Sequence, residues 1–208
     1  MGEEMILQSA PGWLQERLGR ATASRMKDAL AKKKDGSDSE ARRKYAIELI
    51  TERVTGLAIE RFVSDDMRRG SELEEVARGL YEIRTGELVG PAALIHHPTI
   101  EWLSATPDGF LADDGLIEIK VPRPERFIEW RMSGSIPDEH IPQMLGQLSC
   151  TGRQWVDFIA YCDTVPPAHQ LYVRRFVPEP GAIAKFEADA AEFLKMVDRM
   201  FEQFTEAA

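Results

Sequence analysis

A short pattern around a predicted β-hairpin constrains this chain more than any other feature. It consists of Thr106-Pro107-Asp108-Gly109 and, nine residues after the glycine, Glu118-Ile119-Lys120. Between them, Asp113-Asp114-Gly115 predicts a tight turn joining two strands. Alternation along the second strand places Glu118 and Lys120 on one face, and the turn brings Asp108 opposite them. The pattern therefore predicts two carboxylates and an ammonium group meeting at one end of a hairpin.

This combination of groups indicates a particular chemistry. Two adjacent carboxylates repel each other, and both stay ionised when a cation joins them. Oxygen ligands suit Mg²⁺ or Mn²⁺ better than zinc, and a neighbouring lysine can position water or stabilise charge on a phosphate. These groups together predict metal-assisted hydrolysis of a phosphodiester. A solvated Glu-x-Lys pair on a strand is the alternative, and other segments must favour one of the two.

Two helical segments favour catalysis. A helix expected over residues 65–85 carries Glu74 beside its apolar face, where its carboxylate can reach the sheet edge and add a metal ligand. On a helix expected over 140–151, Gln143 and Gln147 lie four residues apart next to apolar side chains. Buried amides need partners, which a metal-bound water, a phosphate or the protein core would supply.

The N-terminal region favours a phosphate ligand. Arg17 precedes an expected helix start that the hydroxyl of Thr22 or Ser24 would cap, and helix N-termini and arginine forks both bind anions. The net charge of −9 argues against a nucleic-acid partner, but basic residues outnumber acidic ones between Arg17 and Arg53. Total charge therefore does not exclude DNA.

The remaining pattern predicts a single domain over residues 1–208, with a mixed central β-sheet flanked by helices. A short helix is expected to end at Leu30, and further helices are expected over 41–54, 65–85, 124–132 and 140–151. Strands are expected over 93–97, 101–104, 109–112, 116–120, 155–161 and 170–177. A polar loop near 32–40 is expected to be mobile, and an amphipathic helix to cover about 180–204. Short apolar stretches exclude a membrane span, and two cysteines indicate a reducing cytoplasm.

Five motifs in order resemble the phage λ exonuclease family, the YqaJ-like alkaline exonucleases, within the PD-(D/E)xK nuclease superfamily. They are Arg17-Leu-Gly-x-x-Thr22-Ala-Ser24, Arg69-Gly70-x-x-x-Glu74, Pro107-Asp108-Gly109, Glu118-Ile-Lys120-x-Pro122, and Gln143 before Gly152-x-x-Trp155-x-Asp-Phe158. The resemblance extends from Trp13 to about Tyr161 and implies the α/β fold of that superfamily, which is also called restriction-endonuclease-like.

The resemblance also implies roles for individual residues. The metal ligands would be Asp108, Glu118, Glu74 and the backbone carbonyl of Ile119, with Lys120 as the catalytic lysine and Gln143 orienting water or phosphate. The 5′-terminal phosphate of the DNA would be held by Arg17, Ser24, Thr106 and Arg126, with Thr106 standing where serine is usual.

The activity implied by the resemblance is digestion of one strand of duplex DNA from its 5′-phosphorylated end, in the 5′→3′ direction, leaving a 3′ overhang for single-strand annealing. It implies Mg²⁺, which Mn²⁺ can replace, with two ions bound alongside substrate. It further implies a homotrimeric ring around DNA, a single-strand annealing protein as partner, and a phage or prophage gene expressed in a bacterial cytoplasm. The alternatives are a structure- or site-specific endonuclease of the same superfamily and a catalytically silent DNA-binding scaffold.

Overall fold

The computed structural model describes residues 12–59, 64–91 and 93–206. Its helices, with η marking a 3-10 turn, are α1 (Trp13–Arg17), η1 (Ala23–Arg25), α2 (Met26–Ala29), α3 (Glu40–Thr55), α4 (Asp65–Thr85), α5 (Pro124–Ser133), η2 (Asp138–His140), α6 (Ile141–Thr151), η3 (Pro167–His169) and α7 (Ala182–Glu206). Its strands are β1 (Ala21–Thr22), β2 (Val89–Gly90), β3 (Ile95–His96), β4 (Leu103–Ala105), β5 (Gly109–Leu111), β6 (Gly115–Lys120), β7 (Trp155–Tyr161) and β8 (Leu171–Phe176).

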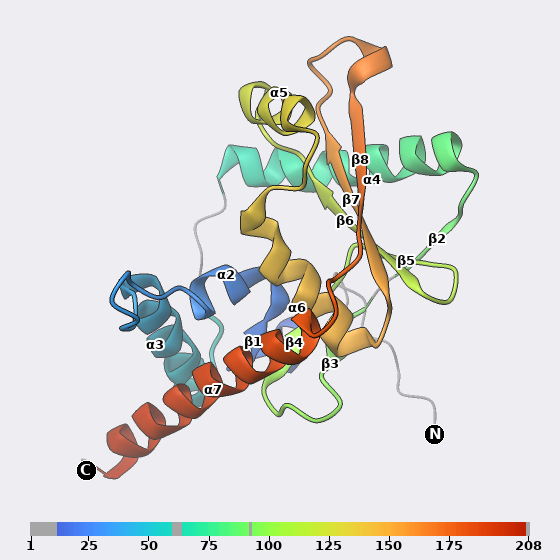
Figure 1. The fold of residues 1–208 in the computed structure, drawn as a ribbon. Helices are drawn as coiled ribbons and strands as arrows, with labels where there is room; N and C mark the ends of the chain where they lie inside the picture. The colour runs from blue at the N-terminus through green and yellow to red at the C-terminus, as the bar shows by residue number, and fades with distance from the viewer. Residues whose placement is uncertain (1–11, 60–63, 92, 207–208) are drawn as a thin grey trace.

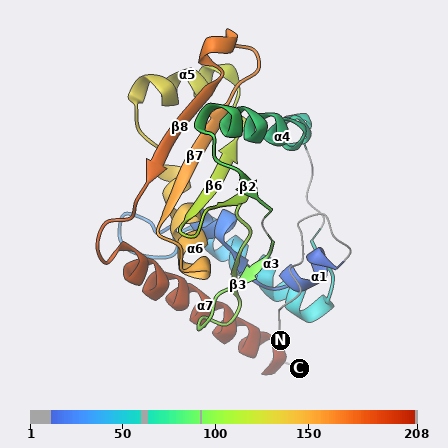
Figure 2. The ribbon, with the colours of Figure 1, turned by 90° about the vertical axis from the view of Figure 1, so that its right-hand side faces the viewer.

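The larger of the two sheets is mixed and has five strands (Figure 1). Its order is β2-β5-β6-β7-β8, with β6 and β7 parallel and every other pair antiparallel. The long connection that parallel strands require runs through α5 and α6. Leu116 and Phe158 pack toward these helices, whereas Ile117 and Ile119 pack toward α4. Helices therefore cover both faces of the sheet (Figure 2), as the sequence predicted.

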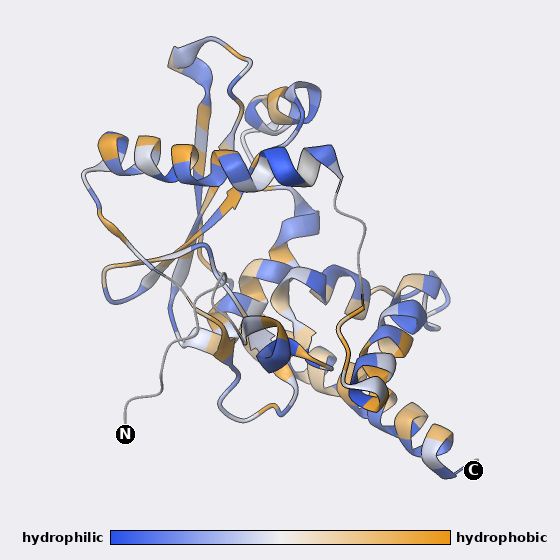
Figure 3. Ribbon diagram, turned by 180° about the vertical axis from the view of Figure 1, so that it is seen from behind, coloured by the Kyte–Doolittle hydropathy of each residue, from blue (hydrophilic) through white to orange (hydrophobic). Residues whose placement is uncertain are grey.

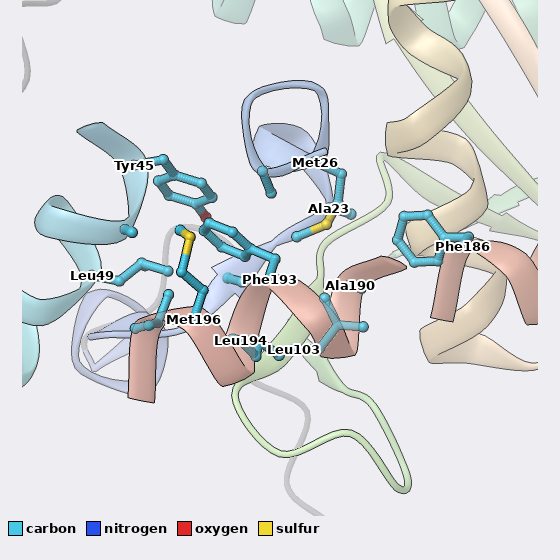
Figure 4. Close-up of a cluster of buried hydrophobic side chains, with 14 of the residues drawn as sticks. Ala23, Met26, Tyr45, Leu49, Leu103, Phe186, Ala190, Phe193, Leu194 and Met196 are labelled. Carbon is cyan, nitrogen blue, oxygen red and sulfur yellow. The ribbon is translucent and has the colours of Figure 1, made fainter. Parts of the chain in front are cut away.

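A second core anchors the N-terminal segment to the C-terminal helix. The small sheet β1-β4-β3 lies against α2, α3 and α7. Tyr45 and Phe193 stack with ring centroids 5.5 Å apart, and Met26 and Phe186 belong to the same buried cluster (Figure 4). One side of α7 supplies much of this cluster, in agreement with its amphipathic sequence (Figure 3). This packing holds η1 and α2 close to the larger sheet.

Both ends of α3 have a local chemical cause. The Ser39 hydroxyl accepts a hydrogen bond from the Arg42 backbone N–H at 3.1 Å and caps α3. Gly56 ends α3 with φ of 65°, a left-handed conformation that glycine adopts without steric cost. The bounds of α4, residues 65–85, are those expected from the sequence.

The predicted strands over 93–97 and 101–104 were partly wrong. The structure contains β3 over Ile95–His96 and β4 over Leu103–Ala105, and Trp102 between them has φ of 65°, which interrupts extended backbone. The two-residue strands β1 and β2 were not predicted, because so short a pairing leaves no alternation in the sequence.

The polar loop near 32–40 makes contacts at both of its ends. Lys32 and Asp38 form an isolated antiparallel bridge, and Lys32 Nζ lies 3.0 Å from Glu192 Oε1 on α7. The mobility of this loop stays a prediction. Both cysteine thiols, Cys150 and Cys162, are free and buried, and no helix among the described residues could cross a membrane.

The hairpin before the candidate site depends on a close contact at Gly115. A Cβ atom there would lie 2.2 Å from Cη2 of the Trp155 indole. Gly115→Ala is therefore expected to destabilise the fold by about 1–3 kcal/mol through overpacking, measured by urea unfolding. Gly79 in α4 has open space around it, so Gly79→Ala should instead stabilise by up to about 1 kcal/mol. Equal stability of the Gly115 variant and the parent protein would contradict this account of the hairpin.

Candidate active site

Glu118 lies at the centre of the candidate site and is only 1% exposed. Gln143 Nε2 donates to its Oε1 at 2.6 Å, and Gln147 Nε2 donates to its Oε2 at 2.5 Å. Lys120 Nζ also lies 2.5 Å from Oε1. Two amides of α6 and one ammonium group of β6 thus hold a buried carboxylate, which would otherwise be strongly destabilised.

Asp108 lies directly before β5 and is held largely by backbone groups. Its N–H donates to the Ile117 carbonyl at 3.2 Å, and the Ile119 N–H donates to its Oδ2 at 2.6 Å. Arg78 Nη2 on α4 donates to the Asp108 backbone carbonyl at 2.6 Å. Arg78 was not identified from the sequence. Its signal is the four-residue spacing from Glu74, which places both side chains on one face of the helix.

A cavity of about 180 Å³ joins the predicted catalytic and phosphate-binding residues. Its lining consists of Trp13, Arg17, Thr22, Ala23, Ser24, Glu74, Thr106, Asp108, Glu118, Ile119, Lys120 and Gln143. Arg126 is not part of it. This residue lines a neighbouring cavity of about 490 Å³ and forms an ion pair with Glu139. The structure therefore brings together all the predicted site residues except Arg126.

The expected helix cap next to Arg17 was wrong. Arg17 ends α1, with its guanidinium carbon 4.1 Å from the Trp13 ring centroid, and η1 begins at Ala23 without a side-chain cap among the described residues. The Thr22 and Ser24 hydroxyl oxygens instead lie 3.3 Å apart and line the cavity. The hydroxyls are thus placed for a ligand rather than for the helix.

The acidic groups of the cavity repel one another. Burial and the charge of Glu118 raise the pKa of Asp108 well above its usual range, and the same two causes raise the pKa of Glu74. Burial alone would lower the pKa of Lys120, but the charges of Glu118 and Asp108 outweigh it and raise that pKa. These raised pKa values show that the cations already present do not fully compensate the clustered carboxylates, so the site favours an additional cation.

The donor set suits a hard divalent cation. It combines the carboxylates of Asp108, Glu118 and Glu74 with the Ile119 carbonyl, and these oxygen ligands fit Mg²⁺ or Mn²⁺. Among the described residues, no group of three His, Cys, Asp or Glu side chains is arranged to hold a metal as it stands. The hydrogen bonds at Glu118 give a reason, because Lys120 and Gln143 already use its Oε1.

The mixed sheet, with an aspartate before one strand and Glu-x-Lys on the next, defines a nuclease fold of the PD-(D/E)xK type. Over residues 12–154 the chain matches the YqaJ-like viral recombinase domain, and it belongs to that family. The predicted family is thereby confirmed.

Solved structures give the same class. The alkaline exonuclease LHK-Exo from Laribacter hongkongensis is 39% identical, with a TM-score of 0.86 over 94% of this chain and 96% of that one. LHK-Exo in complex with dAMP has the same identity and coverage, and a TM-score of 0.87. A phage-related exonuclease from Haemophilus somnus 129PT shares the fold, with 12% identity and a TM-score of 0.69 over 89% of this chain and 96% of its own. No curated protein matches the sequence.

Gln147 differs from Gln143 in that its side chain is fully buried. Gln147→Leu would leave Oε2 of the buried Glu118 without its amide donor. We expect the free energy of unfolding to fall by about 1–3 kcal/mol, the cost of an unsatisfied buried polar group. Gln143→Leu is the matched control and should have a smaller effect, since Gln143 is partly exposed and Lys120 also binds Oε1. Urea unfolding of both variants tests this, and equal losses would contradict it.

His140 links stability to pH. It packs against Trp130 and Phe158, with ring centroids 5.2 and 5.3 Å away, and burial with the charge of Lys120 lowers its pKa from 6.5 to about 4. The contribution of neutral His140 to the free energy of unfolding is therefore fully present above pH 6.5 and is lost as the pH falls toward 4. His140→Phe should remove this loss, seen as a smaller drop in melting temperature from pH 7 to 4.5. The raised pKa values of Asp108 and Glu74 make the fold more stable as the pH falls. They are present in both the parent and the His140→Phe variant. Identical pH profiles would contradict the assignment.

Proposed function

We propose that this protein is a metal-dependent exonuclease that digests one strand of duplex DNA from its 5′-phosphorylated end, leaving a 3′ overhang for single-strand annealing. The observation that carries the proposal is the cavity in which Asp108, Glu118 and Lys120 meet Arg17, Ser24 and Thr106. Hydrolytic groups and phosphate-binding groups thus share one small space. The relative LHK-Exo has been solved with dAMP, a nucleoside monophosphate and hence the kind of product this reaction releases.

The metal would be Mg²⁺, with Mn²⁺ able to replace it and two ions present with substrate. Asp108, Glu118, Glu74 and the Ile119 carbonyl would hold it. When bound, it supplies Lewis acidity toward the phosphoryl group and lowers the pKa of water.

The side chains of the chain would carry out the remaining steps. Lys120, kept protonated by its carboxylate neighbours, would donate to the phosphate oxygens as negative charge develops on them. Gln143, once released from Glu118, would orient the attacking water. Arg17, Ser24 and Thr106 would hold the terminal phosphate, so that water attack breaks the next P–O3′ bond and the terminal nucleotide leaves with a free 3′-hydroxyl.

The assembly is part of the same proposal. A homotrimeric ring around DNA would let a chain of net charge −9 bind phosphates through an inner basic surface. Its partner would be a single-strand annealing protein, and its setting the cytoplasm of a bacterial cell carrying the phage or prophage gene. A silent scaffold is disfavoured because Asp108 and Glu118 are adjacent acids that repel each other, and a scaffold has no need of such a pair.

The catalytic assignment is tested with Lys120→Ala. Because this lysine would act on charge that develops during the reaction, we expect cleavage to fall by about 100-fold or more while folding and DNA binding persist. Asp108→Ala should lose metal binding as well. The assay is Mg²⁺-dependent digestion of linear duplex labelled separately at its 5′ and 3′ ends, beside closed circular DNA. Digestion by Lys120→Ala at the parent rate would contradict the mechanism, and cleavage of the circle would indicate an endonuclease.

A further inference from the structure

Outside the catalytic cavity, one carboxylate holds two cations that come from different helices. Lys27 Nζ on α2 lies 3.0 Å from Glu139 Oε2, and Arg126 Nη2 on α5 donates a close hydrogen bond to Glu139 Oε1. The side chains of Lys27 and Arg126 are 61% and 51% exposed, whereas that of Glu139 is 26% exposed. The cations thus face solvent while the carboxylate lies beneath them.

The cluster lies beside the proposed reaction site. Lys27 is three residues after Ser24, which lines the catalytic cavity. Arg126 and Glu139 line the neighbouring cavity of about 490 Å³, whose wall includes Val121, the residue after Lys120. A strand held near Lys120 would therefore pass close to both cations.

The charge of the cluster suits a DNA phosphate. Burial acts to raise the pKa of Glu139, but the bonds from Lys27 and Arg126 hold it at about 2, so the carboxylate is ionised at neutral pH. Two cations and one anion leave a net charge of +1, which equals the charge of one phosphodiester with the sign reversed. The carboxylate also presents two acceptor oxygens to the same donors, as a phosphate does.

We propose that Lys27 and Arg126 form a binding site for a phosphate of the DNA strand, and that Glu139 occupies this site until DNA displaces it. The inference rests on the proposed function and adds Lys27 and Glu139 to Arg126, which the family resemblance assigns to the 5′-terminal phosphate. Displacement requires the two ion pairs of Glu139 to break, so this residue opposes DNA binding. A purely structural Glu139 would instead support binding by holding the two helices in place. The sign of the effect separates the two roles.

The experiment measures duplex DNA binding by the full chain in EDTA, by fluorescence anisotropy over a range of salt. Glu139→Gln should tighten binding about two- to fivefold, because DNA then displaces no ion pairs, and the two pairs of Glu139 are each weak at this partly exposed position. Lys27→Ala should weaken binding and reduce the slope of log K against log salt by about 1, since one phosphate contact is lost. Lys27→Arg should retain the slope.

Asp189→Asn is the matched control, because it removes the same unit of negative charge from a lysine pair on α7. Asp189 Oδ2 lies 2.5 Å from Lys185 Nζ in that pair. We expect Asp189→Asn to bind DNA with the same affinity as the parent protein. Equal tightening by both variants, or unchanged or weaker binding by Glu139→Gln with an unaltered melting temperature, would overturn the inference.

Duplexes with 5′-phosphate and 5′-hydroxyl ends identify the phosphate. Tightening by Glu139→Gln on both substrates supports an internal backbone phosphate, and tightening on phosphorylated ends alone supports the terminal phosphate. Cleavage by the parent protein in Mg²⁺ is measured in parallel. If the parent protein binds DNA without cutting it, only the proposed function is contradicted. If the parent cuts DNA but Glu139→Gln binds DNA with the parent's affinity, only this inference is contradicted.

Discussion

The buried carboxylate of Glu118 is the constraint on which the rest of the site depends. Ionised groups are costly in a protein interior unless they are paired and hydrogen-bonded. Here the two amides of α6 and the ammonium group of Lys120 meet that requirement. The position of α6 against the sheet is therefore part of the chemistry, because a displaced helix would leave the carboxylate unsatisfied.

The cavity is assembled from two separately packed cores. Ser24 follows a segment fixed by the cluster around Tyr45 and Phe193, whereas Glu118 belongs to a strand between the clusters on either face of the larger sheet. The phosphate-binding and hydrolytic groups thus come together only when both halves are in place. Helix α6 joins them, since Cys150 packs in the first core and Leu148 in the second.

Much of this arrangement could be predicted from the sequence, because its signals are local. The hairpin follows from its turn residues and alternation, and α3, α4 and α7 follow from caps and helical spacing. The spacing from Glu74 places Arg78 on the right helix face, but its bond to Asp108 could not be found in this way, since it joins positions 30 residues apart. The same holds for the contact of Lys27 with Glu139, across 112 residues. The hydroxyls of Thr22 and Ser24 were given the wrong local role because tertiary packing turned them toward the cavity.

The turn at Asp113-Asp114 also determines whether the site can exist at all. Side chains alternate along β6, with Leu116 packing on the α5–α6 side and Ile117 and Ile119 on the α4 side. A one-residue insertion there that shifted the pairing with β5 and β7 would exchange the two faces. Isoleucines would then occupy the ligand positions and two charged groups would enter the core against α4. The chemistry and the stability of this protein therefore depend on the same pairing register of β6.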